Sequence, residues 1–379
     1  MKKLISIIFT IFLIFTIAIV CMLNKPFVKR QINKAYGMYY VYKGDKAYRQ
    51  MKANKSIAFY NKGLELYPEH YGAWYNLGNL YVAYEDYYAA LYAYSQAFKY
   101  NPNMMVARMN YGIISTEKLG DFDSALEQYN KIVETNRKTF HIPYIYNNKL
   151  SSKENKAIAY YNIGVAYRMK SLYEHDNWEL QRTYLSKAID AYKKSLKISP
   201  NSYDTLFNLG LAYQVTGNLN KAGKCYCKAI KVAPMNYEAH YNLAVLLRRL
   251  GKFQDSYEEI DKASTIVSAL GDNSSLQYYM SVIMNDITRS YYQSAEHQKA
   301  LQNLLKEEER KLKAHAKRSE KKIKTKENKT NGTIVNEEMA NIAGLQVSPE
   351  EMDLAVIKNF GKCPSIKYFE EEYSDSDDY

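Results

Sequence analysis

Histidine and cysteine are the residues of this chain best suited to catalysis or metal binding, and their spacing favours neither. No nucleophile motif, phosphate-binding loop or metal constellation accompanies the six scattered histidines, which are His70, His141, His175, His240, His297 and His315. No two cysteines have the C-x-x-C spacing of a zinc site. We therefore expect no enzymatic activity, no metal and no cofactor.

The cysteines also give no sign of a disulfide framework. Cys225 and Cys227 are two residues apart on an expected helix, so they point to different faces and are poorly placed to bond to each other. Cys363 lies far away in the C-terminal tail. This usage is compatible with a reducing compartment but does not demonstrate one.

A pattern of small, aromatic and turn-forming residues recurs along the chain every 34 residues. Glycine and alanine are small enough to let two helices cross closely, tyrosine and leucine fill the space between the helices, and proline ends the second helix. The best two copies carry Leu77-Gly78, Tyr81, Ala90, Tyr94, Ala97 and Pro102, and Leu209-Gly210, Tyr213, Ala222, Tyr226, Ala229 and Pro234.

This pattern resembles the tetratricopeptide repeat (TPR), whose period and signature are the same. The resemblance implies an all-α protein, a right-handed superhelical solenoid of antiparallel helix pairs over residues 37–270. The units are expected to start near residues 37, 71, 105, 157, 203 and 237, with residues 138–156 as an irregular link. One extra residue falls near the turn at 119–121, and 12 more are placed between two helices, around residues 173–181.

The resemblance also indicates where a partner would bind, because the first helix of each repeat lines the concave groove of such solenoids. The fifth repeat residue is Tyr75, Met109, Tyr161, Phe207 and Tyr241 in successive units, and the sixth is always asparagine: Asn76, Asn110, Asn162, Asn208 and Asn242. Polar residues that stand nearby complete the predicted groove: Asn79, Arg168, Gln214, Arg248 and Arg249.

Two interpretations of this groove remain open. The asparagines are able to bond the backbone amides of an extended peptide while the aromatic rings supply apolar contact. Alternatively, asparagine and tyrosine are common repeat residues that satisfy local hydrogen bonds. The three arginines favour an acidic partner only if they are not simply solvated surface residues. The apolar fifth positions do not supply the cationic clamp with which some TPRs hold acidic C-termini.

A segment of 20 uncharged residues, 4–23, precedes the repeats and is long enough to cross a bilayer as a helix. We interpret residues 1–23 as an N-terminal transmembrane anchor and residues 24–36 as a basic juxtamembrane linker. A cleaved signal peptide is the alternative, although Val20 and Cys21 do not make the small-residue cleavage site that it requires.

The side of the membrane that the repeats face is left undetermined by two conflicting signals. The very short N-terminal tail, with Lys2 and Lys3, favours repeats outside the cytoplasm. The downstream flank carries Lys25, Lys29 and Arg30, and the positive-inside rule then favours a cytoplasmic repeat domain.

Beyond the repeats, residues 271–326 are predicted to form a capping helix that runs into a long, charged, basic helical arm. The arm is either a solvated helix or a contact for anionic lipid; no nucleic-acid partner is expected. Residues 327–379 are predicted to be a largely disordered tail with an acidic end.

These features predict a single-pass membrane protein that recruits or assembles other proteins, or extended peptides from them, through its TPR groove. The N-terminal helix would contact the lipid bilayer. The alternative is a structural or self-assembling array that acts through its convex face or its basic arm on lipid or on like chains. The oligomeric state cannot be derived from the residues.

Overall fold

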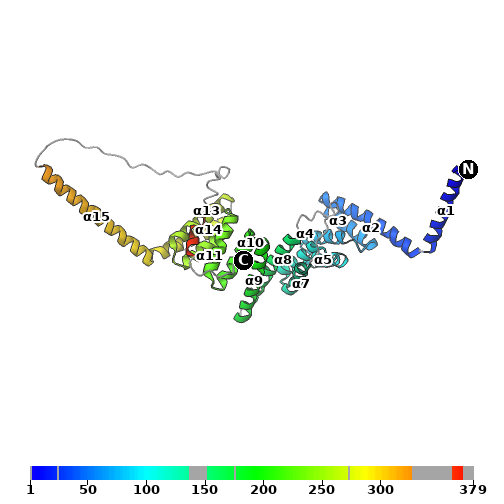
Figure 1. Ribbon diagram of the computed structural model, residues 1–379, viewed down its shortest axis with the longest axis horizontal. Coiled ribbons are helices and arrows are strands. Elements are labelled where there is room, and N and C mark those ends of the chain that lie inside the picture. The colour runs from blue at the N-terminus through cyan, green and yellow to red at the C-terminus, as the bar shows by residue number, and fades with distance from the viewer. Residues whose placement is uncertain are drawn as a thin grey trace. The chain divides into compact units, whose positions relative to one another are not determined.

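The computed structural model describes residues 2–23, 25–135, 152–174, 176–271, 274–326 and 361–369. Within those ranges every regular element is a helix (Figure 1). The chain divides into two compact units, Met1–Ile198 and Ser199–Tyr379. The predicted link at residues 138–156 lies mostly outside the described residues, as do the ends of the tail.

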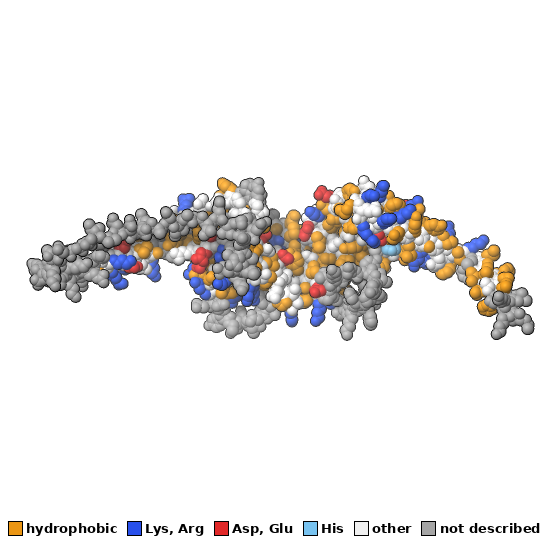
Figure 2. All heavy atoms as spheres, turned by 90° about the horizontal axis from the view of Figure 1, so that it is seen from above, with side chains coloured by type: hydrophobic (Ala, Val, Ile, Leu, Met, Phe, Trp, Pro, Cys, Tyr) orange, Lys and Arg blue, Asp and Glu red, His pale blue; other side chains and the backbone are white. Residues whose placement is uncertain are grey.

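The first unit begins with two long helices, α1 (Lys2–Leu23) and α2 (Lys25–Arg49). The predicted linker at 24–36 is therefore helical from Lys25 onward, and the first hairpin starts upstream of residue 37. Apolar side chains cover the visible part of α1 (Figure 2). Among the residues that the structure describes, no helix is both long enough and apolar enough to span a membrane.

Helical hairpins follow one another through the rest of the first unit, each packed on the next. The partner of α2 is α3 (Ala53–Leu66). The following hairpins are α4 (Tyr71–Ala83) with α5 (Tyr87–Tyr100), α6 (Met105–Ile114) with α7 (Phe122–Glu134), and α8 (Ser152–Tyr173) with α9 (Trp178–Ile198).

The second unit holds two hairpins and the helices that come after them. The hairpins are α10 (Tyr203–Val215) with α11 (Leu219–Val232), and α12 (Tyr237–Arg249) with α13 (Phe253–Ala269). The capping helix and the basic arm predicted over 271–326 are separate helices, α14 (Ser274–Tyr292) and α15 (Ala295–Lys326), rather than one continuous helix. α14 packs against α13 and buries Met280 and Ile287. A short 3₁₀ helix, η2 (Pro364–Tyr368), lies against α11.

The repeat pattern places the starts of several helices correctly, and side-chain caps stabilise some helix starts. The first helices of four hairpins start at the predicted residues 71, 105, 203 and 237. Before α5, α7 and α10, the side chains of Asp86, Asp121 and Ser202 each accept a hydrogen bond from a backbone N–H of the helix. Each bond satisfies a donor that has no partner within the helix.

Five of the six hairpin cores are built on a contact between a glycine of the first helix and a tyrosine ring of the second. The rings are almost completely buried, and a methyl group added to any of these glycines would lie 2.4 to 2.6 Å from the nearest ring atom. The pairs are Gly44–Tyr60, Gly78–Tyr94, Gly112–Tyr129, Gly164–Tyr192 and Gly210–Tyr226. The sixth hairpin has Ala244 and Ile260 instead, both buried.

The single extra residue of the third repeat is accommodated inside its first helix. α6 continues as a one-turn π-helix, η1 (Ser115–Leu119), before Gly120 turns the chain with a φ of 66°. A π-turn holds one more residue than an α-turn, so the inserted residue leaves the surrounding hairpin intact.

The 12 extra residues of the fourth repeat were predicted between its helices, and this placement is wrong. The insertion lengthens the helices themselves, because α8 has 22 residues and α9 has 21, and only residues 174–177 separate them. The lengthened helices contact each other through the stacked rings of Tyr167 and Tyr184, whose centroids are 6.1 Å apart, while Leu172, Tyr173 and Trp178 at the far end are exposed.

Candidate protein-binding surfaces

The predicted groove residues divide between the two units and lie on first helices of hairpins throughout. The first unit carries Tyr75, Asn76 and Asn79 on α4, Asn110 on α6, and Tyr161, Asn162 and Arg168 on α8. The second carries Phe207, Asn208 and Gln214 on α10, and Tyr241, Asn242, Arg248 and Arg249 on α12. Each unit therefore presents a surface of its own.

Aromatic residues at the fifth repeat position are held in one recurring arrangement. Tyr75 lies 5.9 Å from the buried Tyr94 ring, Tyr161 lies 6.1 Å from Tyr192, and Phe207 lies 6.1 Å from Tyr226, with ring planes tilted by 43° to 46°. Each of the three outer rings is half-buried. Because the inner tyrosine is fixed by its glycine, the outer ring is positioned before any partner arrives.

The first two asparagines of the predicted ladder tie neighbouring hairpins together. The Nδ2 of Asn76 donates to the Asp45 carboxylate at 3.3 Å and to the Tyr60 hydroxyl at 3.2 Å. The same contacts recur 34 residues on, because Asn110 Nδ2 lies 3.3 Å from Asn79 Oδ1 and 3.4 Å from the Tyr94 hydroxyl. In both cases the inner tyrosine donates to the acidic or amide oxygen.

The other three asparagines use Nδ2 in different ways. Asn208 and Asn242 donate to the carbonyl oxygens of the residues four positions earlier, at 2.9 and 2.8 Å, and Asn162 lies 3.1 Å from the Met109 sulfur. Local hydrogen bonding, the second interpretation of the ladder, thus accounts for at least one Nδ2 bond in each of the five. An amide also has an acceptor oxygen, so peptide binding by these residues stays a prediction.

The polar residues beside the ladder also have internal roles. Gln214 accepts a hydrogen bond of 2.8 Å from the Tyr226 hydroxyl. Arg248 forms an ion pair of 2.6 Å with Asp286 on α14, so the helix after the repeats already supplies this arginine with an acidic partner. Arg249, its neighbour, is exposed.

Burial raises the pKa of the inner tyrosines, which stay neutral near neutral pH. The pKa of Tyr94 rises to about 12 because of desolvation. Desolvation likewise raises the pKa values of Tyr129, Tyr192 and Tyr226. For Tyr60 desolvation is the largest cause, and the hydrogen bond to Asp45 raises its pKa further.

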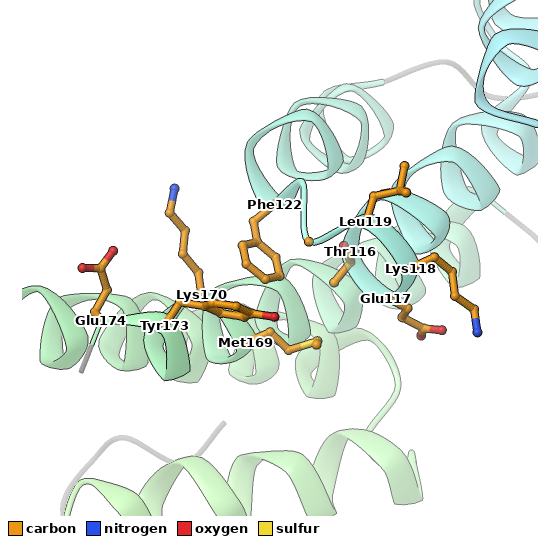
Figure 3. Close-up of a pocket in the computed structure, with 10 residues that line it drawn as sticks. Thr116, Glu117, Lys118, Leu119, Phe122, Met169, Lys170, Tyr173 and Glu174 are labelled. Atoms are coloured by element: carbon orange, nitrogen blue, oxygen red, sulfur yellow. The ribbon is translucent and has the colours of Figure 1, made fainter. Parts of the chain in front are cut away.

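A surface pocket of about 460 Å³ opens where the π-helix meets the end of α8, and the sequence did not predict it (Figure 3). The rings of Phe122 and Tyr173 meet at its side, with centroids 5.4 Å apart and planes tilted by 56°. Lys170 also lines it and pairs with Asp123 at 2.6 Å. The inserted residue that forms η1 is the only feature of the sequence that marks this place.

The tail docks on the second unit through a contact that the sequence analysis missed. Cys227 of α11 forms a disulfide with Cys363, whereas no disulfide was predicted. Phe369 is 2% exposed and its ring covers Gly223 of α11. The Tyr368 hydroxyl donates to Asp255 of α13 at 2.5 Å, and Lys252 lies 4.8 Å from the Tyr368 ring centroid. Residues 361–369 are thus ordered within the tail expected to be largely disordered.

Gly223 is the signal in the sequence that could have revealed this site. A glycine within a helix costs stability relative to alanine, and the repeat pattern does not require one here. Gly223 and Cys227 are four residues apart, so they lie on one face of α11. In the described part of the chain, no group of histidine, cysteine and acidic side chains is arranged to hold a metal ion.

Comparison with known proteins agrees with the helical hairpins. Two models of the tetratricopeptide repeat match the chain, over residues 75–139 and over residues 191–224. No curated protein matches it. The matched segments correspond to the hairpins from α4 to α7 and to the region from α9 into α11.

Among solved structures, the chain is similar to a thermophilic TPR protein of Thermus thermophilus, with 20% identity over 56% of this chain and 98% of that chain and a TM-score of 0.42. It is also similar to PilW, a widely conserved type IV pilus biogenesis factor, with 16% identity over 60% of this chain and 92% of that chain and a TM-score of 0.46. A further similar structure is PilF of Pseudomonas aeruginosa, with 15% identity over 72% of this chain and 99% of that chain and a TM-score of 0.42. Residues 75–139 and 191–224 thus match models of the tetratricopeptide repeat, and the described residues of these segments form helical hairpins.

Proposed function

We propose that this protein is a membrane-anchored scaffold that binds other proteins through the first-helix faces of its two repeat units. The main observation in favour of this proposal is a pair of aromatic rings that recurs at Tyr75–Tyr94, Tyr161–Tyr192 and Phe207–Tyr226. Rings that are already positioned lose little conformational freedom on binding, and aromatic residues dominate the energetics of many interfaces.

The ligand class that suits these faces is an extended peptide with apolar side chains. The first two asparagines use Nδ2 between hairpins, so we assign them mainly to positioning, with the neighbouring rings as the contacts. The ion pair between Arg248 and Asp286 weakens the case for a strongly acidic ligand at α12. Extended peptides suit grooves in which side-chain pockets supply specificity.

Helix α1 is proposed to hold the scaffold at a bilayer. Phe9, Phe12 and Phe15 are each 65% to 67% exposed, and they stand within the uncharged segment 4–23. A run of large apolar side chains without protein cover is stabilised by lipid rather than by water.

The disulfide favours one of the two orientations that the sequence left open. Disulfides persist in oxidising compartments and are rare in the cytosol. Cys227–Cys363 therefore supports a repeat domain outside the cytoplasm, in agreement with the short N-terminal tail and against the basic flank after α1.

Site-specific photo-cross-linking in the native cells tests the binding faces. A photoreactive phenylalanine analogue is placed at Tyr161 or Phe207, and at the exposed Lys231 on α11 as the matched control. We expect the same discrete protein adducts from both groove positions and none from the control. Adducts from Lys231 alone would instead favour the alternative in which the convex face or the basic arm acts.

Membrane attachment and orientation need separate measurements. The full chain should stay in the membrane pellet after alkaline carbonate extraction, whereas a chain lacking residues 2–23 should be released. Thiol alkylation of intact cells followed by non-reducing electrophoresis should show Cys227 and Cys363 blocked. Release of the full chain by carbonate would contradict the anchor, and reactive thiols at both positions would contradict the orientation.

A further inference from the structure

The site that receives the tail has, on the outside of a hairpin, the same kind of contact that builds five of the six hairpin cores. Inside the hairpins, a tyrosine ring covers a glycine that has no room for a methyl group. On α11, Phe369 covers Gly223 in the same way, and a methyl group on Gly223 would lie 2.4 to 2.5 Å from three atoms of the ring. This surface has room for one aromatic ring. A side chain in place of the glycine would fill that room.

Neighbouring groups fix the direction in which the segment lies. Tyr368 reaches α13 through its hydroxyl bond to Asp255, and its ring faces the Lys252 ammonium. Ser365 is buried in the turn of η2. Two adjacent aromatic residues are therefore bound by two helices: Phe369 contacts Gly223 of α11, and Tyr368 contacts Asp255 of α13.

The covalent bond decides whether these contacts persist. Cys227 and Cys363 are separated by 136 residues, and closing so long a loop has a large entropic cost that two aromatic contacts oppose only in part. Cys227 is 3% exposed, whereas Cys363 is half-buried, so a small thiol reaches the bond from the side of Cys363.

We propose that the Gly223 face of α11, together with Asp255, is a second binding site whose ligand is the chain's own segment 363–369, and that Cys227–Cys363 is a latch controlled by a dithiol reductant. This site is independent of the first-helix faces. A reductant thiolate attacks the Cys363 sulfur and releases the Cys227 thiolate. The second reductant thiol then closes the reductant's own disulfide and releases Cys363 as a thiol, so two electrons pass to the chain. The segment is then free to leave the site.

Equilibration of the full chain with reduced and oxidised dithiothreitol tests the docking. The fraction of disulfide is measured by alkylation and mass spectrometry in wild type, Gly223→Ala, Phe369→Ala and the control Lys231→Ala. Losing a buried phenylalanine contact should lower the equilibrium constant for bond formation by about tenfold or more. Lys231→Ala should have the same equilibrium constant as wild type. Every variant should have the far-ultraviolet circular dichroism spectrum of wild type.

Equal constants in all four proteins would overturn the proposal, because the bond would then form without docking. Alanine is a better helix former than glycine, so failure of α11 to fold does not explain a loss in Gly223→Ala. Disulfide-linked dimers of the oxidised wild type on non-reducing gels would also overturn it, since the segment would then occupy a second copy of the chain.

A peptide probe tests whether opening the latch frees the site. The probe is a fluorescent peptide of residues 361–369 with serine in place of cysteine, and fluorescence anisotropy reports its binding. It should bind the full-length double variant Cys363→Ser, Phe369→Ala, whose site is vacated, at least about tenfold more tightly than oxidised wild type. Equal binding to both, or to neither, would contradict the proposal. Adding Gly223→Ala to the double variant should abolish binding.

Discussion

Gly210 shows how strongly a single residue constrains a hairpin, because a methyl group there would lie 2.6 Å from the Tyr226 ring. We expect Gly210→Ala to lower the free energy of unfolding by about 1 to 3 kcal/mol, the usual cost of overpacking a core. Urea denaturation measures this. The control is Val215→Ala, an exposed residue of the same helix, which should change the free energy of unfolding little. Equal stability of Gly210→Ala and wild type would contradict the assigned contact.

A buried histidine–glutamate contact in the last hairpin offers a second test at the residue scale. His240 and Glu259 are 0% and 1% exposed, their side chains lie 2.7 Å apart, and Lys262 reaches the same carboxylate. Glu259→Ala leaves a buried imidazole nitrogen without its hydrogen-bond partner and should cost about 1 to 3 kcal/mol. The control is Glu258→Ala, which is exposed and should change the free energy of unfolding little. Similar urea midpoints for the two variants would contradict a structural role for the pair.

The residue scale is also where the sequence was least informative about binding. The spacing of the asparagines correctly placed them on first helices, but it did not reveal which atoms bond Nδ2. That depends on whether an acceptor such as Asp45 or Asn79 lies on the preceding hairpin, which is a property of the packed pair.

At the scale of elements, the π-helix explains how the third repeat tolerates its extra residue. Deleting Glu117, an exposed residue of η1, should restore a regular helix and change the free energy of unfolding by less than about 1 kcal/mol. Deleting the exposed Val215 from α10, which has no such insertion, should cost about 2 kcal/mol or more, because the following turn rotates out of register. Urea denaturation compares the two. A larger loss from deleting Glu117 than from deleting Val215 would contradict this account.

The lengths of the helices could likewise be predicted only in part. The 34-residue pattern located the starts of α4, α10 and α12, because it depends on residue types at short separations. It did not reveal that the insertion of the fourth repeat extends α8 and α9. A helical extension and a loop differ mainly in whether their apolar residues find a partner helix.

At the scale of the whole molecule, the buried tyrosines predict how stability depends on pH in both units. The folded-state pKa of Tyr94 is about 12, above the ordinary value of 10.0 that applies when the chain is unfolded. Its contribution is therefore fully present below pH 10 and is lost as the pH rises toward 12, by about 1.4 kcal/mol per pH unit.

The raised pKa values of Tyr129, Tyr192 and Tyr226 act in the same direction. Urea unfolding in steps from about pH 9 to pH 11 should therefore show a steep fall in the free energy of unfolding. Ultraviolet titration should show these tyrosines ionising only as the chain unfolds. A flat profile above pH 10 would mean that the inner rings are accessible to solvent.

The amino-acid sequence alone determined the repeat period, the all-helical class and most hairpin starts, because these follow from residue types at short separations. Only the tertiary structure decided that Cys227 meets Cys363, that Phe369 covers Gly223, and that Arg248 pairs with Asp286. The tail contacts join residues more than 100 positions apart. No periodic pattern encodes such contacts, because they arise where surfaces of the folded helices match.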